Sequence, residues 1–194
     1  MNASPPHVVV VAGANGSGKS TSAPALLRDA LEVTEFINAD TIAAGLSAFR
    51  PQSVAVAAGR IMLARMRSLA IARENFAFET TLASRSFTPW LKRLRQDGYR
   101  VHILFLWLRS AELAVRRVAE RVHLGGHDVR AEVVRRRYGA GLQNFFSLYV
   151  PLADSWQMFD NSEPSEPRLI LAGNDKVSVH DPETWQKIQK ARDR

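Results

Sequence analysis

The chain has 194 residues, of which 46% are hydrophobic and 23% charged, and this ordinary globular composition excludes a disordered or fibrous protein. The length predicts one domain over residues 1–194, with flexible ends at about 1–6 and 190–194. The net charge of +7 suits either nucleic acid or phosphorylated small molecules as partners, and charge alone does not decide between them.

Strands are expected at 8–12, 36–38, 76–79, 99–108, 156–160 and 168–172. Helices are expected at 19–30, from 51 to about 69, at 88–96, at 111–123 with Ser110 as cap, at 129–148 and from 182. Strands that alternate with helices predict the α/β class, with a parallel sheet covered by helices on both faces.

Neither a membrane span nor an export signal is evident. The longest strongly apolar run, 101–108, is too short to cross a bilayer, and no basic segment precedes the apolar residues 8–14. The chain has no cysteine, which excludes disulfides and thiolate metal sites and is compatible with a reducing compartment. We therefore expect a cytoplasmic protein with no membrane partner.

Residues 13–20 match the P-loop pattern G-x-x-x-x-G-K-[ST] between an apolar strand and a helix. The glycines allow backbone N–H groups to curl around a phosphate, Lys19 would reach the β- and γ-phosphates, and Ser20 would bind Mg²⁺. The pattern predicts a P-loop NTPase with ATP and Mg²⁺ as cofactors. The expected nucleotide-binding residues are Gly13, Ala14, Asn15, Gly16, Ser17, Gly18, Lys19, Ser20 and Thr21.

Polar residues end the next two expected strands. Asp40 lies two residues after Asn38, which ends the expected strand at 36–38. Asp40 would either accept a hydroxyl proton during phosphoryl transfer, hold Mg²⁺ through water, or cap the turn at 41–43. Glu79 is followed by Thr80 and would be costly to bury unless it pairs or binds a ligand; the alternative is a solvated strand end. We expect Asn38, Asp40, Glu79 and Thr80 on the substrate side.

Arginines are concentrated between 109 and 137. Arg117 and Arg121 share one helix face and would neutralise charge on the transferring phosphoryl group, with Gly125-Gly126 as the hinge of a small lid over about 117–137. Arg137 lies at the edge of a buried stripe, whereas Arg136 points to solvent. The alternative is a solvated basic surface.

The sequence resembles the zeta toxin family of P-loop kinases, especially its short stand-alone bacterial branch. The most specific stretches are F-E-T-T at 78–81, G-G-H-D-V at 125–129 and R-R-R-Y at 135–138. Further matching stretches lie at 13–21, 37–40, 117–124, 142–144 and 159–162.

The resemblance implies a kinase-like fold that transfers the γ-phosphoryl group of ATP to a small-molecule hydroxyl, UDP-N-acetylglucosamine being the best-known family substrate. It implies that Asp40 is the base, that Glu79 contacts the substrate, and that lid arginines flank the γ-phosphate at Arg117 or Arg121, with Arg137 on ATP. A toxin would also have an antitoxin protein as partner.

Two other functions remain open. A P-loop ATPase or GTPase switch would act with a protein partner, but the chain has no guanine-reading N/T-K-x-D and no apolar run that ends in a Walker B aspartate. A polynucleotide kinase is favoured only by the basic charge. Most aromatic residues occupy core-like positions and few remain for base stacking, so nucleic acid is not the expected partner.

Overall fold

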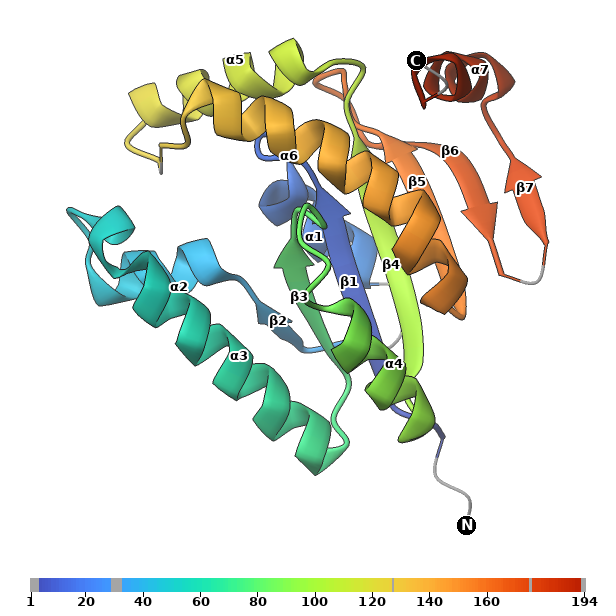
Figure 1. The fold of residues 1–194 in the computed structure, drawn as a ribbon. Coiled ribbons are helices and arrows are strands. Elements are labelled where there is room, and N and C mark those ends of the chain that lie inside the picture. The colour runs from blue at the N-terminus through green and yellow to red at the C-terminus, as the bar shows by residue number, and fades with distance from the viewer. Residues whose placement is uncertain (1–3, 29–32, 127, 175, 193–194) are drawn as a thin grey trace.

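The computed structural model describes residues 4–28, 33–126, 128–174 and 176–192. Within these residues the strands form one sheet in the order β2-β3-β1-β4-β5-β6-β7 (Figure 1). The strands are β1 (His7–Gly13), β2 (Glu35–Ile37), β3 (Phe76–Thr80), β4 (Arg100–Trp107), β5 (Ser155–Asp160), β6 (Arg168–Gly173) and β7 (Val177–Val179).

The expected parallel sheet is confirmed for β2, β3, β1, β4 and β5. β6 and β7 instead extend it antiparallel, which makes the sheet mixed. Only residues 161–167 separate β5 from β6, too few for the helical crossover that a parallel connection requires. β7 was not expected, because three residues are too short to show an alternating pattern.

The helices follow the expected order. They are α1 (Lys19–Arg28), α2 (Ala39–Leu46), the 3₁₀ turn η1 (Pro51–Val54), α3 (Ala55–Ala72), α4 (Thr88–Gln96), α5 (Ala111–His123), α6 (Ala131–Asn144), the π-helical η2 (Phe145–Tyr149), the 3₁₀ turn η3 (Val150–Leu152) and α7 (Pro182–Arg192). The expected helix at 129–148 is therefore divided, since α6 changes to π-helical geometry at residue 145. α2 is a full helix where only a turn was expected.

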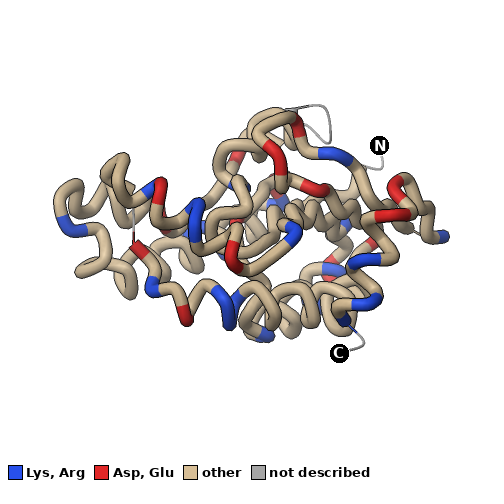
Figure 2. The backbone as a smooth tube through the Cα atoms, turned by 90° about the horizontal axis from the view of Figure 1, so that it is seen from above, with Lys and Arg blue, Asp and Glu red and all other residues tan. Residues whose placement is uncertain are grey.

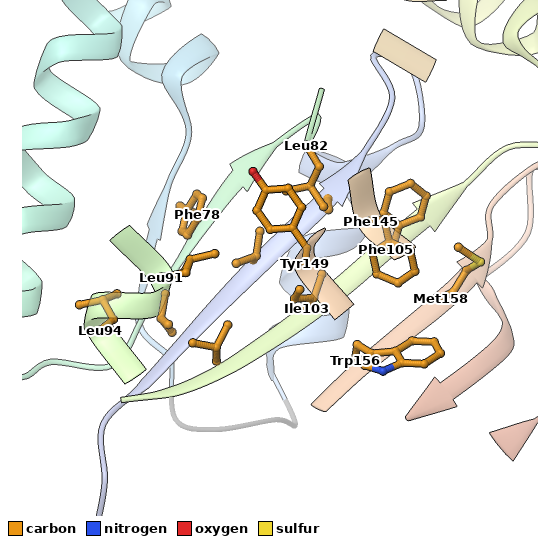
Figure 3. Close-up of a cluster of buried hydrophobic side chains, with 14 of the residues drawn as sticks. Phe78, Leu82, Leu91, Leu94, Ile103, Phe105, Phe145, Tyr149, Trp156 and Met158 are labelled. Carbon is orange, nitrogen blue, oxygen red and sulfur yellow. The ribbon is translucent and has the colours of Figure 1, made fainter. Parts of the chain in front are cut away.

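Side chains of β1 alternate between the two faces of the sheet. Val8 and Val10 pack on the face covered by α3, α4 and α6, whereas Val9 and Val11 pack on the face covered by α1. The first face carries the large hydrophobic cluster in Figure 3, in which the ring centroids of Phe105 and Phe145 lie 4.5 Å apart. Burial on both faces fixes the carboxyl end of β1, where the candidate site begins.

No helix in the described ranges is long and apolar enough to cross a membrane. Figure 2 shows lysines and arginines spread over several elements and interspersed with acidic residues. The positive charge is thus distributed, and nothing in this view gathers it into one nucleic-acid-binding stripe.

Candidate nucleotide and acceptor site

The loop between β1 and α1 has the backbone geometry of a phosphate cradle. Gly13, Gly16 and Gly18 have φ angles of +141°, +78° and +82°, which residues with a side chain rarely adopt. A Cβ atom at Gly16 would lie 2.7 Å from the carbonyl oxygen of Ala114, so α5 also packs directly against this loop. The P-loop predicted from the sequence is present between a strand and a helix.

Lys19 lies buried at the mouth of the P-loop. Its ammonium donates hydrogen bonds to the carbonyl oxygens of Gly13 (2.9 Å) and Ala14 (2.8 Å), and it lies 3.5 Å from Oε1 of Glu79. Burial lowers the pKa of Lys19 below its ordinary value, and the neighbouring Glu79 carboxylate partly offsets this by raising it. A cation held here suits the β- and γ-phosphates of a nucleotide.

Glu79 connects the P-loop to β2. Ser20 Oγ donates to Glu79 Oε2 at 2.6 Å, and Asn38 Nδ2 donates to the same oxygen at 2.7 Å and to Ser20 Oγ at 3.1 Å. The strand register explains why Glu79 lies beside the P-loop, since Glu79 pairs with Val11, two residues before the P-loop begins. Glu79 is therefore paired, and the alternative that it is only a solvated strand end is wrong.

The donors around Ser20 fit a magnesium ion. Because Ser20 gives its hydroxyl proton to Glu79 and accepts one N–H from Asn38, one lone pair of its oxygen is left for a hard cation, with a carboxylate beside it. Ser20 and Glu79 are the residues that would hold Mg²⁺. A place for Glu79 beside Ser20 was not expected from the sequence, because a Walker B residue is an aspartate and here the apolar run 76–78 ends in a glutamate.

Asp40 lies in the first turn of α2 and its side chain is exposed. It lines a cavity of about 330 Å³ together with Ser20, Asn38, Arg121 and Gly126. Asn38 caps the N-terminus of α2: its Oδ1 accepts hydrogen bonds from the N–H groups of Asp40 (2.7 Å) and Thr41 (3.2 Å). The alternative that Asp40 is the helix cap is therefore wrong, and its carboxylate is available to a ligand in this cavity.

Thr80 and Thr21 follow the two sides of the site, and their contacts with substrate and nucleotide stay predictions. The hydroxyl oxygen of Thr80 accepts the N–H of Leu82 at 3.2 Å and so shapes the turn after β3. Leu82 has a φ of +54°, and its carbonyl is held by the buried Asn144 at 2.8 Å. Thr21 is exposed in the first turn of α1, and the described structure gives its side chain no contact with the cavity.

The expected lid arginines occupy different places. Arg121 lines the cavity, and Arg137 Nη1 donates to Asn15 Oδ1 at 3.1 Å, above the P-loop. Arg117 instead donates to the backbone carbonyls of Asn161 (2.7 Å) and Ser162 (2.9 Å), so it holds the loop after β5. The expectation that Arg117 and Arg121 act together on a phosphate is therefore corrected for Arg117, whose guanidinium is bonded to these two carbonyls. Arg136 is exposed, as expected.

Gly125 and Gly126 directly follow the C-cap of α5, Leu124. The N–H of Gly126 bonds to the carbonyl of Arg121 and that of Gly125 to the carbonyl of Val122, both at 2.9 Å, with a φ of +83° at Gly125. These bonds form a Schellman motif, which explains the glycines without a hinge. The hinge itself stays a prediction, and the next residue, His127, lies outside the described residues.

The lid segment packs closely on the P-loop. Val118 of α5 and Val134 of α6 are buried against Ala14 in a small apolar cluster. In Figure 1, α5 and α6 cross the carboxyl edge of the sheet as an antiparallel pair. This packing brings Arg121 and Arg137 to the phosphate end of the site.

Asn161 is a site residue for which the sequence analysis assigned no role. It is buried, and its Nδ2 donates to the carbonyl of Ser17 at 2.7 Å, which braces the P-loop from the end of β5. Two signals in the sequence could have found it, namely a polar residue directly after an apolar strand and the match of 159–162 to the zeta toxins.

Residues 8–148 match the family model of an AAA domain, which is more than half of the chain. The chain belongs to the AAA_33 family of AAA domains. An uncharacterized protein of Haemophilus influenzae is 29% identical to this AAA_33 chain over 126 residues, which are 65% of the chain and 88% of the relative.

Solved structures show the same fold at low identity. A chain of the PezAT chromosomal toxin–antitoxin system of Streptococcus pneumoniae aligns with a TM-score of 0.68 and 11% identity, over 100% of the AAA_33 chain and 86% of that chain. The AvrRxo1-ORF1:ORF2 complex with ATP aligns with a TM-score of 0.73 and 14% identity, over 96% and 64%. The AAA_33 chain thus spans less than two thirds of the AvrRxo1 chain, and the fold is P-loop kinase-like.

Proposed function

We propose that the protein is an ATP-dependent phosphotransferase of the zeta-toxin type, a single P-loop kinase domain that phosphorylates a hydroxyl of a small molecule. The observation that carries the proposal is the cavity beside the P-loop that Ser20, Asp40 and Arg121 line, with Glu79 bonded to Ser20 next to it. A hydrolytic switch has no need of an acceptor cavity with a free carboxylate beside the phosphate site.

In the proposed reaction, Lys19 binds the β- and γ-phosphates and the P-loop amides surround them. The acceptor oxygen attacks the γ-phosphorus while Asp40 takes the hydroxyl proton. The new P–O bond forms as the bond to the β-phosphate oxygen breaks, and ADP leaves. Arg121 and Arg137 stabilise the charge on the transferring group. Mg²⁺ supplies further neutralisation of the phosphates when bound.

The cavity of about 330 Å³ would hold the part of the acceptor that carries the reacting hydroxyl. A UDP-N-acetyl-sugar is the first acceptor to test because the sequence resembles the zeta toxins, and a sugar nucleotide of this kind would have to extend beyond the cavity. We further propose that the protein acts in the cytoplasm and that a protein antitoxin regulates it, as the resemblance implies.

The test is a screen of ATP consumption over UDP-sugars, nucleosides, amino acids, antibiotics and a 5′-hydroxyl oligonucleotide, with wild type and Asp40→Ala in parallel. We expect one class of small alcohol to accelerate ATP consumption in the wild type alone. Stimulation by the oligonucleotide and by no small alcohol would show a polynucleotide kinase instead. ATP consumption that no acceptor changes would indicate an ATPase.

A further inference from the structure

A continuous groove runs between α3 and α4, outside the candidate nucleotide site. Two adjoining cavities of about 580 Å³ and 360 Å³ form it, and Arg67 and Trp90 line both of them. Both helices pack on the same face of the sheet, beside β3 (Figure 1). The residues that line this α3–α4 groove differ from those that line the cavity at Asp40.

The floor of the groove is apolar and adaptable. Met62 and Met66 lie at its base beside Trp90, and their flexible thioether side chains can repack against differently shaped partners. On the rim, Leu63 is 41% exposed and Ile71 is 85% exposed. Large apolar side chains that are exposed along a hollowed surface are typical of a protein-binding site.

The groove has the length of a short helix. Its α3 wall runs from Gly59 through Leu63 and Arg67 to Ile71, at intervals of four residues that keep these positions on one face. Twelve helical steps of 1.5 Å give a wall of roughly 18 Å, or about three turns of a partner helix.

Charge around the groove selects an acidic partner. Arg67, Arg73 and Arg93 line it, against the single acidic side chain of Asp97. Arg73 is engaged with the backbone carbonyl of Asp97 at 2.8 Å, whereas Arg67 and Arg93 form no ion pair with any residue that the structure describes. Two cations beside an apolar floor complement carboxylates that flank an apolar helix face.

We propose that the α3–α4 groove binds an amphipathic helix of a partner protein, apolar on one face and acidic along its flanks. Leu63, Ile71 and Trp90 contact the apolar anchors of this helix, and Arg67 and Arg93 bind its carboxylates. The proposal does not depend on the phosphotransferase activity. Since the groove and the nucleotide site have different lining residues, the partner and a nucleotide bind at the same time.

The test uses three fluorescein-labelled helical peptides of 16 residues and measures fluorescence anisotropy against the full chain. The first peptide carries leucines at i, i+4, i+7 and i+11 with glutamates on the flanks, the second has lysines in place of the glutamates, and the third has serines in place of the leucines. We expect the leucine–glutamate peptide to bind at least about tenfold more tightly than either control. We expect a saturating ATP analogue to leave its affinity unchanged.

Variants on α3 locate the binding surface. Ile71→Glu and Leu63→Glu change exposed side chains in the groove and should abolish binding of the first peptide. Ile61→Glu, 44% exposed on the opposite side of α3, is the matched control and should leave it unchanged. Arg67→Glu with Arg93→Glu should reverse the preference toward the leucine–lysine peptide. Circular dichroism melts confirm that each variant is folded.

Three outcomes would overturn the proposal. Failure of the leucine–glutamate peptide to bind at ~0.1 mM is one, and equal binding of the lysine peptide is another. The third is self-association of the wild-type chain, or its binding to phosphatidylglycerol vesicles, that Ile71→Glu abolishes while no peptide binds. That result would assign the groove to a second copy of this chain or to a membrane surface.

Discussion

In the proposed reaction, side chains at the carboxyl edge of the sheet have two roles, one toward the phosphates and one toward the acceptor. Lys19 and Ser20 belong to the phosphate side, whereas Asp40 faces a cavity large enough for a small molecule. Glu79 joins the phosphate side, because its oxygens lie against Ser20 and Lys19. Substitutions at Asp40 and Glu79 should therefore change different kinetic and binding constants.

Asp40→Asn keeps the shape of the side chain and removes the proton acceptor. We expect kcat to fall by about 10²-fold or more with little change in the KM for ATP, because the carboxylate acts mainly in the transition state. Steady-state kinetics with the acceptor found by the screen measure this. An unchanged kcat would mean that Asp40 takes no part in the proton transfer.

Glu79→Gln should change the effect of Mg²⁺ on nucleotide affinity. Loss of the carboxylate next to Ser20 should weaken binding of a fluorescent ADP analogue about tenfold in Mg²⁺. In EDTA the affinity should stay the same or rise, since a negative charge near the phosphates has been removed. Asp40→Asn is the matched control, because it removes a carboxylate charge from the adjoining cavity, and no hydrogen bond joins Asp40 to Ser20 in the described residues. A raised acceptor KM with an intact Mg²⁺ effect would place Glu79 on the acceptor, as the zeta toxin resemblance implies.

At the scale of elements, helices with strong local signals lie where the sequence predicts them. α4 was expected at 88–96 and is Thr88–Gln96, and α5 begins after Ser110, whose side chain accepts the N–H of Leu113 at 3.1 Å. α2 was missed because its cap, Asn38, was interpreted as a substrate residue. The role of Arg117 could not be predicted, since it depends on a loop 44 residues away in the sequence.

The four arginines on α5 and α6 lie at different distances from the site, and their substitutions should differ in effect. Arg121→Ala and Arg137→Ala should lower single-turnover transfer by about 10³-fold at saturating ATP, because both side chains lie at the phosphate end of the site. Arg136→Ala should change almost nothing. Arg117→Ala should act through the loop at 161–162, with a lower melting temperature and weaker nucleotide binding.

Equal and small losses in all four arginine variants would contradict this ordering. They would show that the segment is a solvated basic surface, and the lid over about 117–137 would have to be abandoned.

At the scale of the whole molecule, the P-loop and the alternation of elements were enough to predict the parallel core. The antiparallel end of the sheet depends on the length of one connection and on a strand of three residues, and neither gives a periodic pattern. The pairing of Glu79 with Ser20 follows from β3 lying next to β1, which is a fact of strand order that local sequence does not contain.

One feature of the sheet should make stability depend on pH. His102 of β4 bonds to His7 of β1 at 2.8 Å and to Ser155 of β5 at 2.7 Å. Burial, with His7 and Arg100 nearby, lowers the pKa of His102 from 6.5 to about 4, although Asp154 opposes the shift. The folded state therefore binds fewer protons than the unfolded state between these values, and stability falls as the pH is lowered through this window.

We expect the free energy of unfolding to decrease by about 1–2 kcal/mol more between pH 7.5 and pH 5 in the wild type than in His102→Gln. Urea unfolding at the two pH values measures this, with His180→Gln, an exposed histidine, as control. The same pH dependence in His102→Gln and in the wild type would show that His102 is not its source.

The central claim is that the γ-phosphoryl group of ATP is transferred to an alcohol at the P-loop cavity. ³¹P NMR of the protein with ATP, Mg²⁺ and a filtered small-molecule cell extract tests it without prior choice of acceptor. The account predicts a new phosphomonoester resonance that grows as ADP forms, and that is absent with folded Lys19→Ala, which lacks the cation at the β- and γ-phosphates. Inorganic phosphate as the sole new product, or an unchanged phosphomonoester signal from Lys19→Ala, would contradict it.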